Sequence, residues 1–170
     1  MATLLLARRR LLTLALPLLA AGCGFRLRGT PNFAFATILV NGAETSALVN
    51  ELRQNIASGS NVQVLPAGTP PEQAQVVLDV LADQREKVVV GLNASGQVRE
   101  FQLRTRIRFR LRTPQGKELI PETELLQQRD ISYNESAALS KEAEEGLLYR
   151  DMQSDIVQQL MRRLAAIKTL

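Results

Sequence analysis

The 170-residue sequence contains no histidine and only one cysteine, and these two absences narrow the possible functions. Histidine is the commonest general base and metal ligand, and a disulfide needs two cysteines. An intramolecular disulfide, a Cys/His metal site and a Ser/His/Asp or Cys/His nucleophile are therefore excluded. Carboxylate, lysine or tyrosine chemistry remains possible in principle. Because no acid, base and nucleophile can be assembled from the pattern, we predict that the chain is not an enzyme.

The apolar run near the N-terminus is too short to span a bilayer. Even counted from Leu11 to Ala21 it falls well short of the roughly 20 residues that a transmembrane helix needs. It follows Arg8-Arg9-Arg10 and precedes the small residues Ala20-Ala21-Gly22, which is the three-part pattern of a secretory signal peptide. We therefore predict a signal peptide over residues 1–22 and a single mature domain over residues 23–170.

The excess of basic residues is concentrated in that first segment. The whole chain carries a net charge of +4, but the signal peptide holds three of the 21 Lys and Arg residues. The mature chain is then nearly neutral, with 18 basic residues against 17 acidic ones. The overall basicity consequently says little about partners, and the places where charge clusters matter more.

The only cysteine, Cys23, directly follows the small triplet. Leu19-Ala20-Ala21-Gly22-Cys23 resembles a bacterial lipobox, in which the cysteine is lipidated and becomes the mature N-terminus. Gly24 stands where an aspartate would signal retention in the inner membrane, so the resemblance implies lipid attachment at Cys23 and anchoring in the outer membrane. We expect a diacylglycerol and an acyl chain such as palmitate there, because several chains anchor more stably than one, and we expect no other cofactor or metal. The alternative is a buried structural cysteine behind a hydrophobic first helix.

Hydrophobic periodicity and turn residues predict the elements of the mature chain. Helical spacing of apolar residues predicts helices over Ser46–Ser58 and Ala137–Ile167, and Gly146 is expected to weaken or kink the second of these. Alternating or β-branched segments predict strands, separated by turns at Asn93–Gly96 and Pro114–Lys117. The predicted strands are Phe25–Arg28, Thr37–Val40, Val62–Leu65, Val76–Leu92, Val98–Thr113 and Glu122–Tyr133. The fold class is therefore α+β, with two amphipathic helices on one face of a four- to five-stranded mixed, mostly antiparallel sheet.

The predicted strand Val98–Thr113 carries a row of arginines. Period-two alternation places Phe101, Leu103, Thr105, Ile107, Phe109 and Leu111 on one face and Arg104, Arg106, Arg108, Arg110 and Arg112 on the other. Same-face residues are about 6.6 to 6.8 Å apart, which makes a cationic row roughly 27 Å long. The apolar face suits the helices, so we expect the arginine face to be open to water or to a partner.

Two interpretations of this row remain open. The arginines either bind an anion rich in phosphate, which guanidinium groups contact bidentately, or form an ordinary strand face paired with acids. Glu122, Glu124 and Asp130 on the next strand are available for such pairs. In the second case the row faces a water-filled or protein-lined cavity.

Several motifs along the mature chain resemble the LptE family of LPS-assembly lipoproteins. They are Gly22-Cys23-Gly24-Phe25-Arg26-Leu27-Arg28-Gly29, Glu100–Leu103, Arg129–Asn134, Ala138–Glu142, Glu144-Glu145, Asp151-Met152 and Gln158–Leu164. The ordered set covers nearly the whole mature chain. The resemblance implies a sandwich of two helices and four strands inside the lumen of a large outer-membrane β-barrel, the LPS translocon. In a one-to-one complex it would plug the barrel, help it assemble and bind lipopolysaccharide during delivery to the outer leaflet.

The resemblance also bears on two single positions. Lys141 matches a basic position of the family and is a candidate lipopolysaccharide contact, with an ordinary solvated helix lysine as the alternative. Asn93 stands where some members carry a basic residue, which puts an anion contact at that turn in doubt. A free periplasm-facing lipoprotein that binds another anionic envelope polymer is the second hypothesis. A nucleic-acid-binding sheet is disfavoured, because Phe101 and Phe109 lie on the face opposite the arginines.

Overall fold

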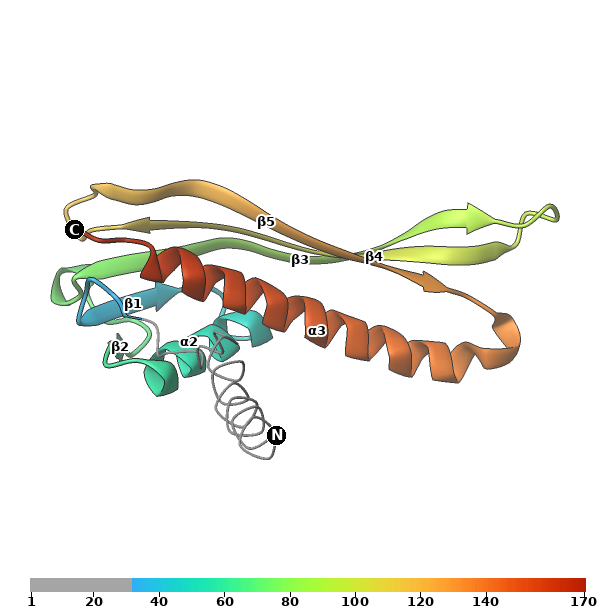
Figure 1. Cartoon of the computed structure of the whole chain (residues 1–170), viewed down its shortest axis with the longest axis horizontal. Coiled ribbons are helices and arrows are strands. Elements are labelled where there is room, and N and C mark those ends of the chain that lie inside the picture. Colours follow the sequence, from blue (N-terminus) through green and yellow to red (C-terminus); the bar gives the residue numbers. More distant parts are fainter. Residues whose placement is uncertain (1–31) are drawn as a thin grey trace, which may run out of the picture. The chain divides into compact units, whose positions relative to one another are not determined.

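The computed structural model of the chain describes residues 32–170. The predicted signal peptide, Cys23 and the strand expected at Phe25–Arg28 lie outside the described residues. Within the described part, no helix is long and apolar enough to cross a membrane. Figure 1 shows its arrangement, in which two helices cover one face of a single sheet.

The sheet has five strands in the order β2-β1-β3-β4-β5. The strands are β1 (Thr37–Asn41), β2 (Gln63–Leu65), β3 (Val76–Leu92), β4 (Val98–Arg112) and β5 (Glu118–Ser132). β1 pairs in parallel with both β2 and β3, whereas β3, β4 and β5 form an antiparallel meander. The predicted α+β class and mixed sheet are thus confirmed. The sheet has one strand more than the four that the family resemblance implies.

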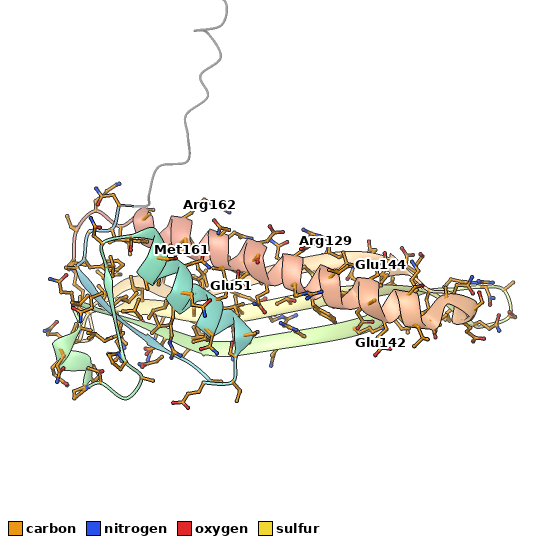
Figure 2. The ribbon with its side chains drawn as sticks, turned by 90° about the horizontal axis from the view of Figure 1, so that it is seen from below. Glu51, Arg129, Glu142, Glu144, Met161 and Arg162 are labelled. Carbon is orange, nitrogen blue, oxygen red and sulfur yellow. The ribbon has the colours of Figure 1, made fainter. Side chains whose placement is uncertain are left out.

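The helices are α2 (Ala47–Gly59) and α3 (Ala138–Ala165), with short 3₁₀ turns at Pro71–Gln73 and Glu135–Ala137. Ser46 caps α2, because its Oγ accepts a hydrogen bond from the Val49 N–H at 3.1 Å. In Figure 1, α2 underlies only the end of the sheet that contains β1 and β2, while α3 runs along most of the meander and the tip of the β3–β4 hairpin projects beyond it. Seen from the helix side in Figure 2, the two helices lie next to each other, and Glu51 of α2 accepts hydrogen bonds from Gln153 and Ser154 of α3.

The core between sheet and helices falls into two parts. The larger core cluster contains nineteen buried residues, which come from α2, the C-terminal half of α3, strands β1, β3, β4 and β5, and the loop positions Phe35 and Val62. A second cluster contains only three buried residues, Leu103, Ile131 and Met152, with Phe101, Leu148 and Tyr149 packed against it. The part of the meander that extends past α2 is therefore held by α3 alone.

The prediction began the last strand at Glu122, four residues too late. β5 begins at Glu118 and contains Pro121, which a strand tolerates at a sheet edge because no neighbour needs its missing N–H. The register shifts opposite Phe109, Leu111 and Arg112 leave extra residues on β5, so this part of β5 bulges.

Candidate functional site

The five predicted arginines lie on the face of the sheet opposite the helices, as the alternation predicted. Leu103, Thr105, Ile107, Phe109 and Leu111 of the same strand are all buried under the helices. The arginine side chains, by contrast, are partly or largely exposed. We call the outer surface of β3, β4 and β5 around Arg104, Arg106, Arg108, Arg110 and Arg112 the arginine face.

Acidic residues of both neighbouring strands flank this row. By register, Glu86 and Asp79 of β3 lie opposite Arg104 and Arg110. On β5, Glu124 and Glu118 lie opposite Arg108 and Arg112. The arginine face therefore carries mixed charge and is not a purely cationic surface.

The strongest pairing on the arginine face centres on Asp79. Its Oδ2 accepts hydrogen bonds from Arg110 Nε at 3.0 Å and from Arg112 Nε at 2.9 Å, and its Oδ1 accepts one from Asn41 Nδ2 at 2.9 Å. The Asp79 side chain is only 11% exposed. Burial opposes its ionisation, but the hydrogen bonds from Arg112, Asn41 and Arg110 and the charge of Arg112 prevail and lower the pKa of Asp79. Two of the five arginines are thus committed to a buried carboxylate.

The remaining three arginines are paired less completely. Arg108 Nη1 donates to Glu122 Oε1 at 2.9 Å, with both side chains about half exposed. Arg106 Nε lies 3.7 Å from Glu124 Oε1, too far for a hydrogen bond, and this buried nitrogen has no partner among the described residues. Arg104 Nε donates to the neutral Gln102 Oε1 at 2.8 Å and makes no ion pair within residues 32–170. Arg104 and Arg106 are therefore the members of the row most available to an external anion.

The acids proposed from sequence partly take the expected roles. Glu122 and Glu124 do lie beside Arg108 and Arg106. Asp130 instead accepts a hydrogen bond from Gln102 Nε2 at 2.9 Å, which links it to Arg104 only through that amide. Asp79 was not among the predicted site residues, although a single carboxyl within the apolar run Val76-Val77-Leu78-Asp79-Val80-Leu81 signals a buried polar group that needs a partner.

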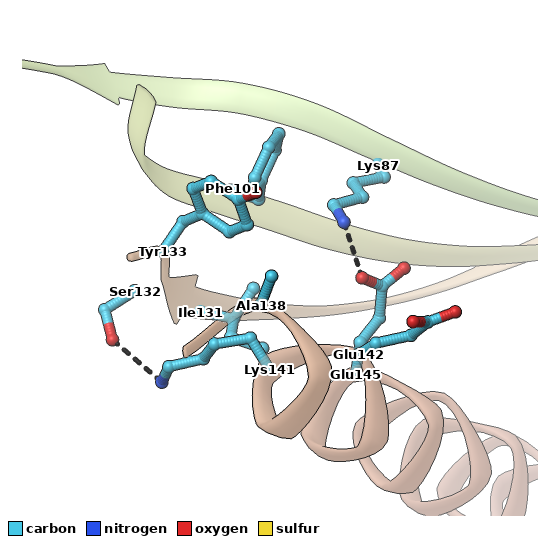
Figure 3. Close-up of a pocket in the computed structure, with 9 residues that line it drawn as sticks. All are labelled: Lys87, Phe101, Ile131, Ser132, Tyr133, Ala138, Lys141, Glu142 and Glu145. Carbon is cyan, nitrogen blue, oxygen red and sulfur yellow. Dashed lines mark hydrogen bonds and ion pairs between the residues drawn. The ribbon is translucent and has the colours of Figure 1, made fainter. Parts of the chain in front are cut away.

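Lys141 lies at a different place, in a pocket on the helix side of the sheet. Figure 3 shows this pocket of about 310 Å³ between the ends of β4 and β5 and the first turns of α3. Lys141 Nζ donates to Ser132 Oγ at 3.1 Å and to Glu144 Oε2 at 2.8 Å. The structure thus separates the candidate anion contacts into two groups, the arginine face and this pocket.

A second cation of the pocket, Lys87, was not anticipated. Its Nζ donates to Glu145 Oε2 at 2.5 Å and lies 4.3 Å from the ring centroid of Phe101. Phe101 in turn meets Tyr133 edge to face, with ring centroids 5.3 Å apart. The pocket therefore combines aromatic rings with two lysines, each of which is paired with a glutamate. The sequence offers no local sign of this, because Lys87 reaches the pocket only through its pairing opposite Leu103.

Within residues 32–170 no group of three or more Cys, Asp or Glu side chains is placed to hold a metal ion. The arrangement is suited to binding anionic or polar groups through arginine and lysine side chains.

Comparison with known proteins gives consistent matches over nearly the whole chain. A sequence model of the LptE lipopolysaccharide-assembly family matches residues 35–164. The LPS-assembly lipoprotein LptE of Pectobacterium atrosepticum is 29% identical, with an alignment that covers 94% of this chain and 88% of that protein. The protein of the same name from Yersinia enterocolitica is also 29% identical and is covered over 78% of its length.

Solved structures of lipoproteins have the same fold. The solution structure of lipoprotein B from Nitrosomonas europaea matches with a TM-score of 0.72 at 30% identity, over 84% of this chain and 91% of that one. The crystal structure of rare lipoprotein B from Shewanella oneidensis matches with a TM-score of 0.64 at 21% identity, over 76% of this chain and 94% of that one. The second likeness bears on the fold alone.

Proposed function

The chain belongs to the LptE lipopolysaccharide-assembly family, and on that premise we propose that it plugs the outer-membrane barrel through which lipopolysaccharide is delivered. It is anchored to the outer membrane through lipid on Cys23 and reaches from the periplasmic side into the barrel lumen. It helps the barrel to assemble in a one-to-one complex and contacts lipopolysaccharide during delivery. We propose no catalytic step, in keeping with an assembly family.

The observation that best supports this proposal is the open, charged arginine face. The helices cover only the other side of the sheet, so this face is available to a partner across three strands. The inner wall of a large membrane barrel is polar, and a plug that fits against it needs a polar surface. Surface ion pairs contribute only about 0 to 1 kcal/mol each, so stability alone gives little reason for Arg104, Arg106 and Arg108, which do not bind the buried Asp79.

The pairing pattern supports a choice among the arginines as lipopolysaccharide contacts. Binding a phosphate at Arg110 or Arg112 would compete with the buried Asp79 carboxylate. At Arg104 it would displace only a neutral amide, and at Arg106 it would compete only with the 3.7 Å contact to the exposed Glu124. We therefore propose Arg104 and Arg106 as the main phosphate contacts on this face, with Arg108 contributing after it releases the exposed Glu122.

Lys141, in the first turn of α3, is proposed as a separate contact. Its two hydrogen bonds are to exposed groups, Ser132 Oγ and Glu144, which an incoming phosphate can replace at small cost. The aromatic rings beside it offer apolar surface to the same ligand. The two groups of cations would then meet different parts of one large, multiply phosphorylated molecule.

The first experiment is affinity purification of the tagged full-length protein in mild detergent, with mass spectrometry of the proteins recovered. A large β-barrel recovered in a one-to-one ratio supports the plug. A clean monomer without any barrel contradicts it and favours a free lipoprotein that binds another anionic envelope polymer.

A second experiment tests the lipopolysaccharide contacts. Replacing both Arg104 and Arg106 with glutamine should weaken binding to immobilised lipopolysaccharide by roughly tenfold or more, because about 1.4 kcal/mol of lost charge-assisted hydrogen bonding gives that factor. The matched control replaces Arg150 and Arg163, which are exposed on α3, and removes the same charge. Equal loss in both double variants would mean that only net charge matters.

A further inference from the structure

Most of β3 has no strand on its outer side. β1 pairs with β3 only from Val76 to Asp79, yet β3 continues to Leu92. Beyond Asp79 the strand pairs with β4 on one side, and no other strand of residues 32–170 lies on the other. Figure 1 shows β3 continuing past the short β1 into the hairpin with β4. Such an edge presents backbone N–H and C=O groups that can pair with another chain.

Side-chain hydrogen bonds link the first half of β3 beyond Asp79 to α3 and to the residue that caps α2. Ser46 Oγ donates to Asp83 Oδ2 at 2.7 Å, and Arg85 Nη2 donates to Gln153 Oε1 at 2.7 Å. The Tyr149 hydroxyl donates to the backbone carbonyl of Glu86 at 2.8 Å. The carbonyl of Glu86 therefore points away from β4, toward the open edge. The segment up to Glu86 is thus tied to the helices.

The last part of the edge, Val88–Leu92, is open and apolar. Backbone groups of an antiparallel strand face the same side at every second residue, so those of Val88 point outward like those of Glu86. No side-chain hydrogen bond reaches the backbone of this segment from elsewhere in residues 32–170. Val89, Val90 and Leu92 are 46%, 47% and 61% exposed. The segment also lacks lysine and proline, which commonly protect free edges, and the nearby Lys87 is held by Glu145.

We propose that Val88–Leu92 binds an extended segment of the barrel polypeptide, which adds to the sheet as a strand beside β3. The inference rests on the proposed function, since it takes the barrel as the partner. The occupant is a peptide, because the outward N–H and C=O groups need both donors and acceptors, which a lipid chain cannot supply. It is neutral and rich in β-branched or other apolar residues, because Val88–Leu92 carries no charge and the nearby Asp83, Arg85 and Lys87 are hydrogen-bonded within the molecule.

The size of the open segment argues against a second copy of this chain as the occupant. Only five residues are free, and two paired segments of this length bury far less than the roughly 1,000 Å² that a specific interface usually needs. The same short pairing is sufficient for a partner that also binds elsewhere on the molecule. A barrel that encloses the arginine face would be such a partner.

The test uses the full-length, lipidated protein purified together with the barrel. Val88→Pro removes the outward N–H without removing a bond to β4, and Val90→Lys adds a charge to the open edge. Leu147→Lys is the matched control, because Leu147 is 54% exposed but lies on α3. We expect both edge variants to lower the recovery of barrel by roughly tenfold under stringent washing, and the control to leave it unchanged. Circular dichroism of each variant verifies that it is folded.

A photo-crosslinking residue placed at Val90 provides a second measurement that does not depend on weakened binding. A crosslink to a barrel peptide supports the inference. A crosslink to a second copy of this chain, to lipid alone or to nothing overturns it, as does full recovery of barrel by both edge variants. In these cases the wild-type protein still recovers the barrel and the plug remains supported. If the wild-type protein recovers no barrel, the proposed function fails and this inference fails with it.

Discussion

At the scale of single residues, Asp79 separates the arginine face into a structural and an available part. One buried carboxylate accepts hydrogen bonds from two arginines and an asparagine on two neighbouring strands. It therefore joins β1, β3 and β4 at the point where β1 ends. Arg104 and Arg106 lie beyond this group and have no comparable partner among the described residues. The same row of arginines can thus stabilise the sheet at one end and contact a ligand at the other.

Asp79→Asn should destabilise the fold by about 1 to 3 kcal/mol at neutral pH. The substitution removes the negative charge that accepts the hydrogen bonds of Arg110 and Arg112 at a largely buried position. Denaturant unfolding followed by circular dichroism measures this change. Glu122→Gln is the control, because it removes an exposed acid from the same face and should cost less than about 1 kcal/mol. Equal effects of the two substitutions would contradict a special role for Asp79.

The same residue predicts how stability depends on pH. The pKa of Asp79 is lower in the folded state than its ordinary value of 3.8, so the folded state favours the ionised form. Its contribution is fully present above that ordinary value and is lost as the pH falls through the folded pKa. We therefore expect the stability difference between wild type and Asp79→Asn to shrink as the pH is lowered below about 4. A constant difference down to that region would show that the carboxylate charge is unimportant.

At the scale of helices and strands, the local pattern predicted most elements but not their neighbours. Alternation found β3 and β4, and Ser46 and the apolar spacing found α2, because these signals act within a few residues. The position of β1 between β2 and β3 depends on pairing across up to about forty residues and left no local signal. The apolar faces alone would fit several strand orders equally well.

The same limit applies to the candidate site: residues placed by local alternation were predicted, and those placed by distant pairing were not. Alternation alone placed the five arginines on one face and identified Glu122 and Glu124 as neighbours. Asp79 was not found, because its place beside Arg110 depends on the register of β3, which shifts at a bulge between Val80 and Ala82. Lys87 and Lys141 share a pocket only because α3 folds back over the end of the meander.

The helix α3 contains a glycine that its packing does not require. A Cβ atom added at Gly146 meets nothing within 4 Å, and glycine in a helix interior costs roughly 0.5 to 1 kcal/mol relative to alanine. Gly146→Ala should therefore stabilise the protein by about that amount. Gly42→Ala is the matched comparison and should destabilise it, because its Cβ would lie 2.8 Å from Val49 Cγ2 and 3.2 Å from Val80 Cβ. Thermal unfolding distinguishes the two signs, and a destabilised Gly146→Ala would mean that the helix needs flexibility there.

At the scale of the whole described domain, the two core clusters divide it into a firmly and a lightly packed part. The firm part contains α2, the C-terminal half of α3 and nineteen buried apolar residues. The light part, around Leu103, Ile131 and Met152, contains three and has α3 alone over the sheet. The Lys141 pocket and the open edge Val88–Leu92 both belong to the light part. The proposed partner and ligand contacts thus lie in the part of the domain with the fewest buried contacts, which binding would order most.

This division predicts a gradient in amide hydrogen exchange. In the free protein, the amides of five residues whose side chains are completely buried in the larger core should exchange only with global unfolding: Val76, Leu78, Ile107, Phe109 and Leu111. Amides of Val88–Leu92 and the first turns of α3 should exchange faster, because few buried contacts hold them. In the purified complex with the barrel, protection should rise at Val88–Leu92 and change little at Val76–Leu78, which is already covered. Uniform exchange in the free protein would contradict the two-part packing. If the barrel does not change the exchange of Val88–Leu92, the barrel segment does not pair with this edge.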